Sequence, residues 1–173
     1  MEVKFNKKKI LLIDNKFINN IFDKRFKKYR ICLHENEQSN TQENIVFTRG
    51  FNYFRTHKHP KKVWESYNVI KGKLNVYLIN NQGKILKKIF LEEKSNNSKL
   101  PFFYKLSKSV FHLVLPASKE VAWQEVTSGR YSKPGFIKFH HKAPHKEDTI
   151  ENKINYCSKI SGINIIKKLK IEK

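Results

Sequence analysis

The hydrophobic positions near the amino terminus follow the helical period. Asp14, a residue type favoured at helix N-caps, opens a stretch in which apolar side chains recur every three or four residues. Those side chains are Phe17, Ile18, Ile21, Phe22 and Phe26. The spacing predicts an amphipathic helix over residues 15–28, and we expect its apolar stripe to cover a sheet.

From Ile45 onward the hydrophobic period changes to two, the period of β-strands. Gly72, the Asn80–Gly83 stretch and the Pro116–Ser118 stretch mark turns between the apolar runs. The expected strands lie near residues 45–49, 51–58, 63–71, 73–80, 84–91, 101–106, 110–115 and 120–127. Many short strands without intervening helices predict an antiparallel sandwich or barrel.

The segments outside this region differ in character. We expect one domain overall, in which residues 1–44 (an arm, a helix and an extended segment) pack on a barrel formed by residues 45–128. Residues 129–173 are expected to form an irregular strap (129–148) and a basic tail (150–173). A final edge strand and a helix fit this tail equally well. The apolar positions of one parity that suggest the strand are Ile163, Ile165, Leu169 and Ile171.

The composition indicates a folded, cytoplasmic domain. Thirteen Phe, seven Tyr and two Trp supply bulky core material for 173 residues. Cys32 and Cys157 form no C-x-x-C motif, so we expect no disulfide framework and a reducing compartment. The apolar run from Ile10 to Ile13 is too short for a signal peptide or a membrane span.

The net charge of +21 raises the question of a nucleic-acid partner. Only five of the 36 basic residues are arginine, the residue best suited to forked contacts with phosphates and bases. The lysine excess accompanies many Asn and Ile residues, a bias that an AT-rich coding sequence produces at solvated positions. We therefore expect a solvated lysine surface first and a general preference for anionic ligands second. Dedicated nucleic-acid binding is the least favoured alternative.

One stretch of the chain carries a candidate metal site. In an extended strand His57 and His59 point to the same side, with their imidazoles about 6–7 Å apart. Glu65 follows on the next expected strand, and His112 lies on a later one. Three imidazoles and a carboxylate suit a divalent transition metal such as Fe, Mn, Ni, Zn or Co.

The order and spacing of these motifs resemble the cupin superfamily, and more closely the WbuC-type cupin-fold metalloproteins found with bacterial surface-polysaccharide genes. The matching pieces are Leu12–Asp14, Arg30–His34, Tyr53–Pro60, Trp64–Glu65, Glu125–Val126, Gly129 and Tyr131. The resemblance implies a mainly all-β chain: a cupin-type double-stranded β-helix, or small jelly-roll barrel, with a short N-terminal α-helix. It also implies a bound divalent metal and a setting in O-antigen or related nucleotide-sugar pathways.

Three departures from the general cupin pattern bear on the site. Five residues separate His59 from Glu65, more than in the general motif. Glu65 is kept as a metal ligand, and the spacing leaves a displaced carboxylate as the alternative. Ser107–Val110 precede His112 where the general pattern has Pro and Gly, so a different turn must aim this histidine. Pro116 stands where the general pattern has Asn.

Three further side chains are candidates for roles around the metal. Tyr53 and Arg55 share the strand face of the two histidines, and Tyr53 is a candidate for proton transfer. Arg55 suits a carboxylate or phosphate of a substrate, or else a salt bridge across the barrel to Glu125. His34 is expected either to close the mouth as an acid, base or ligand support, or to lie in a surface loop. The strap also carries three histidines, His140, His141 and His145. We expect these to be adventitious and not to form a second metal cluster.

These observations leave three functions. The first is a metal-dependent cupin that acts on or binds a nucleotide sugar or another small anionic metabolite in surface-polysaccharide biosynthesis. Its chemistry would be isomerase- or epimerase-like Lewis-acid catalysis, or dioxygen chemistry if the metal is iron. The second is a non-catalytic metal- or sugar-binding accessory module, and the third is nucleic-acid binding. An exposed barrel edge also fits a homodimer.

Overall fold

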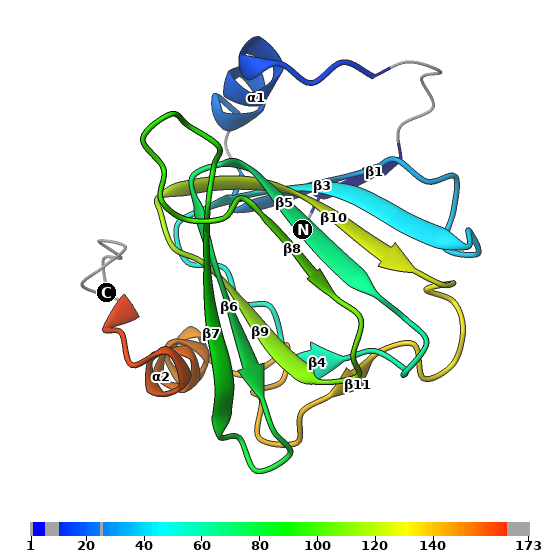
Figure 1. Ribbon diagram of the computed structural model, residues 1–173, viewed down its shortest axis with the longest axis vertical. Coiled ribbons are helices and arrows are strands. Elements are labelled where there is room, and N and C mark those ends of the chain that lie inside the picture. Colours follow the sequence, from blue (N-terminus) through cyan, green and yellow to red (C-terminus); the bar gives the residue numbers. More distant parts are fainter. Residues whose placement is uncertain (1, 6–10, 25, 166–173) are drawn as a thin grey trace.

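Two β-sheets packed against each other form the body of the molecule in the computed structural model, which describes residues 2–5, 11–24 and 26–165 (Figure 1). The first sheet carries, in order, β3 (Thr41–Arg49), β10 (Glu120–Ser128), β5 (Glu65–Lys71) and β8 (Phe103–Leu106). The second carries β4 (His57–Lys58), β9 (Phe111–Pro116), β6 (Lys73–Ile79) and β7 (Ile85–Glu92). Neighbouring strands within this set of eight pair antiparallel.

The order of these strands identifies the architecture. Counted along the chain from β3, the first sheet holds strands one, eight, three and six, and the second holds strands two, seven, four and five. Consecutive strands therefore cross from one sheet to the other, except in the β6–β7 hairpin. This interleaved order is that of an eight-stranded jelly roll. The predicted mainly β fold, a cupin-type double-stranded β-helix with a short amino-terminal helix, is confirmed.

Three further strands extend the two sheets. β2 (Lys28–Cys32) pairs antiparallel with β3, and β1 (Glu2–Phe5) lies parallel beside β2. β11 (Lys138–Phe139) pairs antiparallel with β4. β2 widens the first sheet by one strand. Its side chains therefore extend the sheet face on which the candidate site lies.

The amino-terminal helix is shorter than predicted. α1 (Asn15–Phe22) begins after Asp14, whose carboxylate accepts a hydrogen bond of 2.7 Å from the backbone N–H of Phe17. The apolar spacing continues to Phe26, but the chain leaves the helix because residues from Lys28 onward pair with β3. Phe26 still packs against the cluster formed by α1, β2 and β3. Long-range strand pairing therefore decided where this helix ends.

The predicted strand over residues 51–58 is paired only in β4. The carbonyl of Thr56 accepts a hydrogen bond of 2.9 Å from His140 N–H, and the Tyr53 hydroxyl donates to the carbonyl of Pro144 at 3.0 Å. Both partners belong to the strap. This segment is thus held by the strap rather than by a neighbouring strand, which is why its strand assignment was wrong.

The basic tail forms helix α2 (Ile150–Ser161), so the helical alternative is confirmed over these residues. The side chains that it buries against the second sheet are Ile154, Cys157 and Ile160. The edge-strand alternative is wrong for Ile163 and Ile165, neither of which belongs to a strand. Positions 169 and 171 lie outside the described residues. None of the helices in the described part of the chain is long and apolar enough to cross a lipid bilayer.

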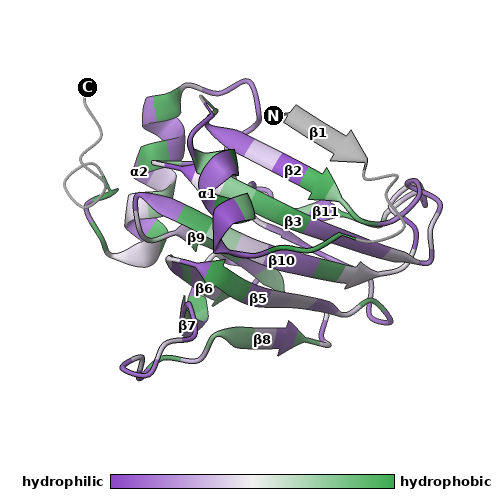
Figure 2. Cartoon of the chain, turned by 90° about the horizontal axis from the view of Figure 1, so that it is seen from above, coloured by the Kyte–Doolittle hydropathy of each residue, from purple (hydrophilic) through white to green (hydrophobic). Residues whose placement is uncertain are grey.

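The core fills the space between the sheets. Trp123 and Tyr67 of the first sheet are fully buried with Leu74 and Val76 of the second. Figure 2 shows apolar and polar positions interleaved along the strands, which is the pattern that the period of two predicted. The end of this interface that faces the strap is polar, and it holds the candidate site.

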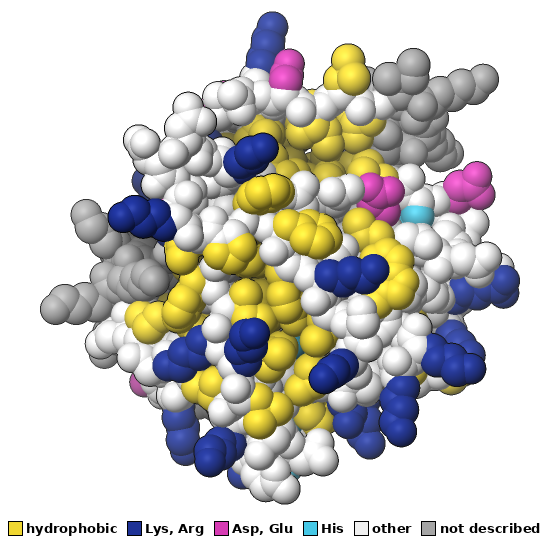
Figure 3. Space-filling model, in the orientation of Figure 1, with side chains coloured by type: hydrophobic (Ala, Val, Ile, Leu, Met, Phe, Trp, Pro, Cys, Tyr) yellow, Lys and Arg dark blue, Asp and Glu magenta, His cyan; other side chains and the backbone are white. Residues whose placement is uncertain are grey.

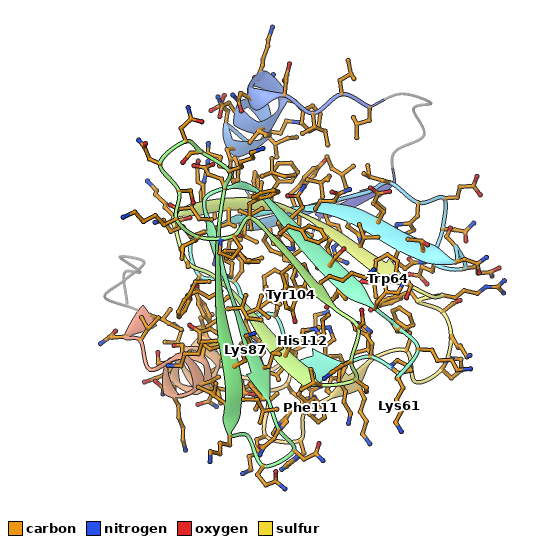
Figure 4. The ribbon with its side chains drawn as sticks, viewed as in Figure 1. Lys61, Trp64, Lys87, Tyr104, Phe111 and His112 are labelled. Carbon is orange, nitrogen blue, oxygen red and sulfur yellow. The ribbon has the colours of Figure 1, made fainter. Side chains whose placement is uncertain are left out.

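The open side between β7 and β8 exposes apolar side chains, which we call the edge face (Figure 3). β7 ends the second sheet and β8 ends the first, so both strands are edges. The exposed apolar residues of the edge face are Leu86, Phe90, Leu100, Phe102 and Phe103. Lysines lie among them: Figure 4 labels Lys87 on β7, and the ammonium of Lys105 on β8 lies 4.5 Å from the Trp64 ring centroid.

Candidate metal centre

Three histidines and one glutamate meet between the two sheets. His57 of β4 and His112 of β9 are direct partners in the second sheet, and His59 lies two residues after His57. Glu65 is the first residue of β5 in the opposite sheet. Each of the four residues offers one ligand atom, and these four atoms all lie within 4.8 Å of one another. Figure 4 shows His112, the most deeply buried of the three histidines, in the interior beside β4.

Backbone carbonyls orient all three imidazoles. In each ring Nδ1 lies at hydrogen-bond distance from a carbonyl oxygen, so Nδ1 carries the proton and donates it. The three pairs are His57 with Arg55 at 2.8 Å, His59 with Phe136 at 2.9 Å and His112 with Val110 at 3.2 Å. This tautomer leaves the Nε2 lone pair of each neutral ring as the atom available to a metal.

The atoms at the centre of the cluster lack ordinary partners. Glu65 Oε1 lies 3.4 Å from His59 Nε2, and Glu65 Oε2 lies 3.0 Å from His112 Nε2. Both Nε2 atoms and Oε2 are buried without a hydrogen-bond partner. Electron-rich atoms facing one another at these distances are stabilised by a cation, and three nitrogens with one carboxylate oxygen form a donor set for transition metals. The four residues therefore fit the metal that the sequence predicts.

The ionisation of the cluster also suits metal binding. Burial lowers the pKa of His57 to about 3, and neighbouring His112 adds to the effect. Burial raises the pKa of Glu65, but His112 and His59 outweigh it and hold that pKa well below its usual range. Burial lowers the pKa of His59, yet Glu65 outweighs burial and raises it overall. At neutral pH, Glu65 is ionised and His57 is neutral, as metal ligands must be.

The long spacing between His59 and Glu65 does not displace the carboxylate. The extra residues form a turn in which the Val63 N–H donates to the Pro60 carbonyl at 3.0 Å. Glu65 then enters β5 opposite Thr127 of β10, whose hydroxyl donates to Glu65 Oε1 at 3.3 Å. The turn absorbs the added length, so Glu65 reaches the cluster with the three histidines and the displaced alternative does not hold.

A serine holds the segment that replaces the Pro and Gly of the general pattern. The Ser109 hydroxyl donates to the carbonyl of His59 at 2.5 Å. This bond ties the residues before β9 to the strand segment that carries the first two histidines. The orientation of His112 thus depends on a side-chain hydrogen bond, whereas the general pattern uses a constrained turn.

A cavity of about 510 Å³ adjoins the cluster. His57, His59 and Glu65 contribute to its wall. The structure also brings the three other predicted side chains, His34, Tyr53 and Arg55, to the wall of the same cavity. A space of this size accommodates a small metabolite beside the metal ligands.

Arg55 does not bridge the barrel to Glu125, so that alternative was wrong. Glu125 pairs instead with Arg30 of β2, at 3.2 Å between Oε1 and Nη2. The Arg55 guanidinium lies over the ring of Phe139, 4.4 Å from its centroid, and its buried Nε has no hydrogen-bond partner. The edge of the guanidinium is therefore the part that can meet a ligand in the cavity.

Tyr53 and His34 are both engaged with backbone. The Tyr53 hydroxyl donates to Pro144 at 3.0 Å, and burial raises its pKa above the usual range. His34 Nδ1 lies 2.9 Å from the carbonyl oxygen and 3.1 Å from the nitrogen of Glu43 in β3. His34 therefore belongs to the cavity wall and not to an isolated surface loop.

Sequence reasoning missed Lys28 and the strap carbonyl of Phe136. Lys28 was assigned to the end of the amino-terminal helix, whereas it begins β2 and lines the cavity. The signal for it was the period of two at Lys28, Arg30, Cys32 and His34, all of which line the cavity. Backbone carbonyls have no sequence signature, so Phe136 could not be found in this way.

The strap histidines do not assemble a second metal cluster among the described residues. His140 is fully buried, stacks on His141 with ring centroids 4.6 Å apart, and holds the carbonyl of Asn80 at 3.2 Å through Nε2. It anchors the strap to the β6–β7 turn. His145 is exposed.

Comparisons with known proteins give one family model and distant structural similarities. A model for a domain of unknown function (DUF6016) matches residues 14–91, which is less than half of the chain. No curated protein matches the sequence. Among solved structures, an uncharacterized conserved protein with a double-stranded β-helix domain from Klebsiella pneumoniae is 12% identical, with a TM-score of 0.48 over 67% of this chain and 81% of that one.

Two other solved structures are similar at the same level. A cupin superfamily protein from Desulfitobacterium hafniense is 8% identical, with a TM-score of 0.45 over 61% of this chain and 80% of that one. An oxalate oxidase in complex with the substrate analogue glycolate is 19% identical, with a TM-score of 0.43 over 58% of this chain and 46% of that one. Because identities and scores are this low, the fold assignment rests on the strand order of the chain itself.

Proposed function

We propose that this chain is a metal-dependent cupin-fold protein that binds a small anionic metabolite and acts on it by isomerase- or epimerase-like chemistry. The observation that carries the proposal is the set of unpartnered His59, His112 and Glu65 atoms beside a cavity large enough for a metabolite, with His59 and Glu65 in its wall. His57 completes the ligand set.

A divalent transition metal held by these four residues would polarise a carbonyl or hydroxyl oxygen as a Lewis acid. Arg55 would bind a carboxylate or phosphate of the metabolite through the guanidinium edge that Phe139 leaves open. We assign proton transfer to His34 rather than to Tyr53, because the Tyr53 hydroxyl is held by the Pro144 carbonyl and its pKa is raised by burial.

The biological setting that we propose is surface-polysaccharide biosynthesis in the cytoplasm, with a nucleotide sugar or a related sugar derivative as the metabolite. The support for this setting is the resemblance to WbuC-type cupins in the pieces around His34, Arg55 and Glu65. The cations at the cavity wall also suit the phosphates of such a metabolite.

The test is elemental analysis of tag-free protein with a matched control. Wild type is compared with His57→Ala/His59→Ala and with His141→Ala/His145→Ala, which removes two exposed histidines. We expect one equivalent of a transition metal in wild type and in the control, and none in the first variant. Absence of metal from reconstituted wild type, or its retention in the first variant, contradicts the proposal. Circular dichroism verifies that all three proteins are folded.

A further inference from the structure

A second polar cluster lies on the floor of the cavity, away from the metal ligands. Lys28 and Arg30 of β2, Asn44 of β3 and Glu125 of β10 all line the cavity. Their strands are neighbours in the order β2, β3, β10. Asn44 is the direct partner of Glu125 across the β3–β10 ladder. Arg30 reaches over β3 to place its guanidinium on the Glu125 carboxylate.

This cluster has hydrogen-bonding capacity that the protein does not use. Asn44 is 3% exposed, and its buried Oδ1 has no partner. Arg30 uses Nη2 on Glu125, but its Nε is buried without a partner. Buried donors and acceptors left without partners are costly, so each unpaired group points to a missing ligand or water.

The charges of the cluster do not balance. Within the cluster, Arg30 and the protonated form of Lys28 face the single carboxylate of Glu125. No carboxylate in the described residues forms an ion pair with Lys28, whose ammonium lies 3.6 Å from the centroid of the Phe54 ring. Burial, and to a lesser extent the neighbouring Arg30, lower the pKa of Lys28 to about 7, and Glu125 offsets only part of this shift. An anion on this floor would add a counterion and favour the charged form of Lys28.

The strand register sets the distance between this cluster and the metal centre. Glu65 of β5 pairs with Thr127 of β10, and Glu125 lies two residues further along β10. One strand spacing across and two residues along amount to about 8 Å between the backbone positions of Glu65 and Glu125. This separation suits a six-carbon sugar with an anionic group at one end better than it suits a ligand of two or three carbons.

We propose that Lys28, Arg30 and Asn44 form a subsite for the anionic end of a six-carbon sugar acid or sugar phosphate, whose other end faces the metal centre. Lys28 and Arg30 bind the carboxylate or phosphate, and Asn44 Oδ1 accepts a hydrogen bond from a sugar hydroxyl. This inference rests on the proposed function only for the end of the ligand that faces the metal. It adds to that function the length and the chemical class of the ligand.

The test is isothermal titration calorimetry of the metal-loaded protein with three probes: glucuronate, glucose 6-phosphate and uncharged glucose. We expect the two anions to bind at least tenfold more tightly than glucose, and the stronger of the two identifies carboxylate or phosphate as the preferred group. Lys28→Gln is expected to weaken anion binding about tenfold without changing metal content. Glu125→Gln is expected to strengthen it, because Arg30 is then free to pair with the ligand.

A double variant separates the loss of anion binding from an effect of misfolding. Arg30→Gln alone leaves Glu125 unpaired, whereas Arg30→Gln/Glu125→Gln replaces the ion pair by two amides and should fold. It is expected to bind the anions about tenfold more weakly than wild type. The subsite is overturned if no anion binds to the metal-loaded wild type or if glucose binds as tightly as the anions. It is also overturned if Lys28→Gln and Arg30→Gln/Glu125→Gln bind the anions as tightly as wild type. Anion binding by a wild type that takes up no metal would support the subsite and contradict the proposed function.

Discussion

The strap contacts the candidate metal centre through Phe136, and Phe136→Ala tests whether this contact orients His59. The Phe136 carbonyl accepts the Nδ1 proton of His59, and its ring lies against the imidazole with centroids 5.1 Å apart. Phe136 is 5% exposed and also packs on Tyr131, at 5.8 Å between ring centroids. Removal of the ring deletes the packing that holds the carbonyl over His59.

The expected loss follows from the role of such partners. Groups that orient a metal ligand are worth about 10–100-fold in metal affinity, which corresponds to about 1.4–2.7 kcal/mol. The affinity is measured by competition with a chromophoric chelator on the folded variant. Phe136→Leu, which keeps apolar packing under the strap, is expected to recover most of the affinity.

Phe139→Ala provides the matched control. Its ring belongs to the same strap and is 45% exposed, and no ligand histidine uses its carbonyl. Its ring lies 6.3 Å from that of His57, so we expect a change in metal affinity of less than about threefold. If Phe136→Ala binds metal as tightly as wild type, or if Phe139→Ala loses as much, the strap does not orient His59 and the reasoning fails.

Two other predictions concern stability. The pKa of Lys28, lowered to about 7 by burial and Arg30, lies below its unfolded value of about 10.4. The folded protein therefore binds fewer protons than the unfolded one between these values, and the free energy of unfolding rises with pH across that window. In urea titrations Lys28→Met should stabilise most at pH 6 and progressively less towards pH 9, whereas exposed Lys27→Met should show no such trend. Gly72→Ala would place a Cβ 2.3 Å from the Glu120 carbonyl oxygen at a φ of 79° and should cost about 1–3 kcal/mol. Gly50→Ala, with a φ of 67° and no atom within 4 Å of its Cβ, should cost less, and equal losses in thermal melts would refute the steric argument.

The strands were predictable because a sheet buried on one face imposes a period of two. The same rule failed over residues 51–56, where alternation is satisfied by contacts with the strap instead of a ladder. It also could not separate strand from helix in the tail, since a few apolar residues of one parity fit both periods. Helix α2 was decided by packing against β6 and β9, which is a long-range property.

The ligand set was predictable for a different reason. His57 and His59 are close in sequence, and the motif that includes Glu65 and His112 limits where they can converge. The cavity floor was not predictable, because it depends on β2 pairing with β3 and on which way Arg30 turns. Local sequence placed Lys28 in a helix, and only the completed sheet puts it beside Arg30.

The lysines of the edge face have a consequence for the behaviour of the protein in solution. Exposed strand edges invite pairing with other copies, and lysine repulsion is one means of preventing it. At about 0.1 M salt the screening length is about 10 Å, so Lys87 and Lys105 keep approaching copies apart; at about 1 M it falls to about 3 Å. Self-association through Phe90, Phe102 and Phe103 should therefore increase with salt, the opposite of an interface built from ion pairs. Light scattering across a salt series would separate these two behaviours, and purification at low ionic strength should keep the chains dispersed.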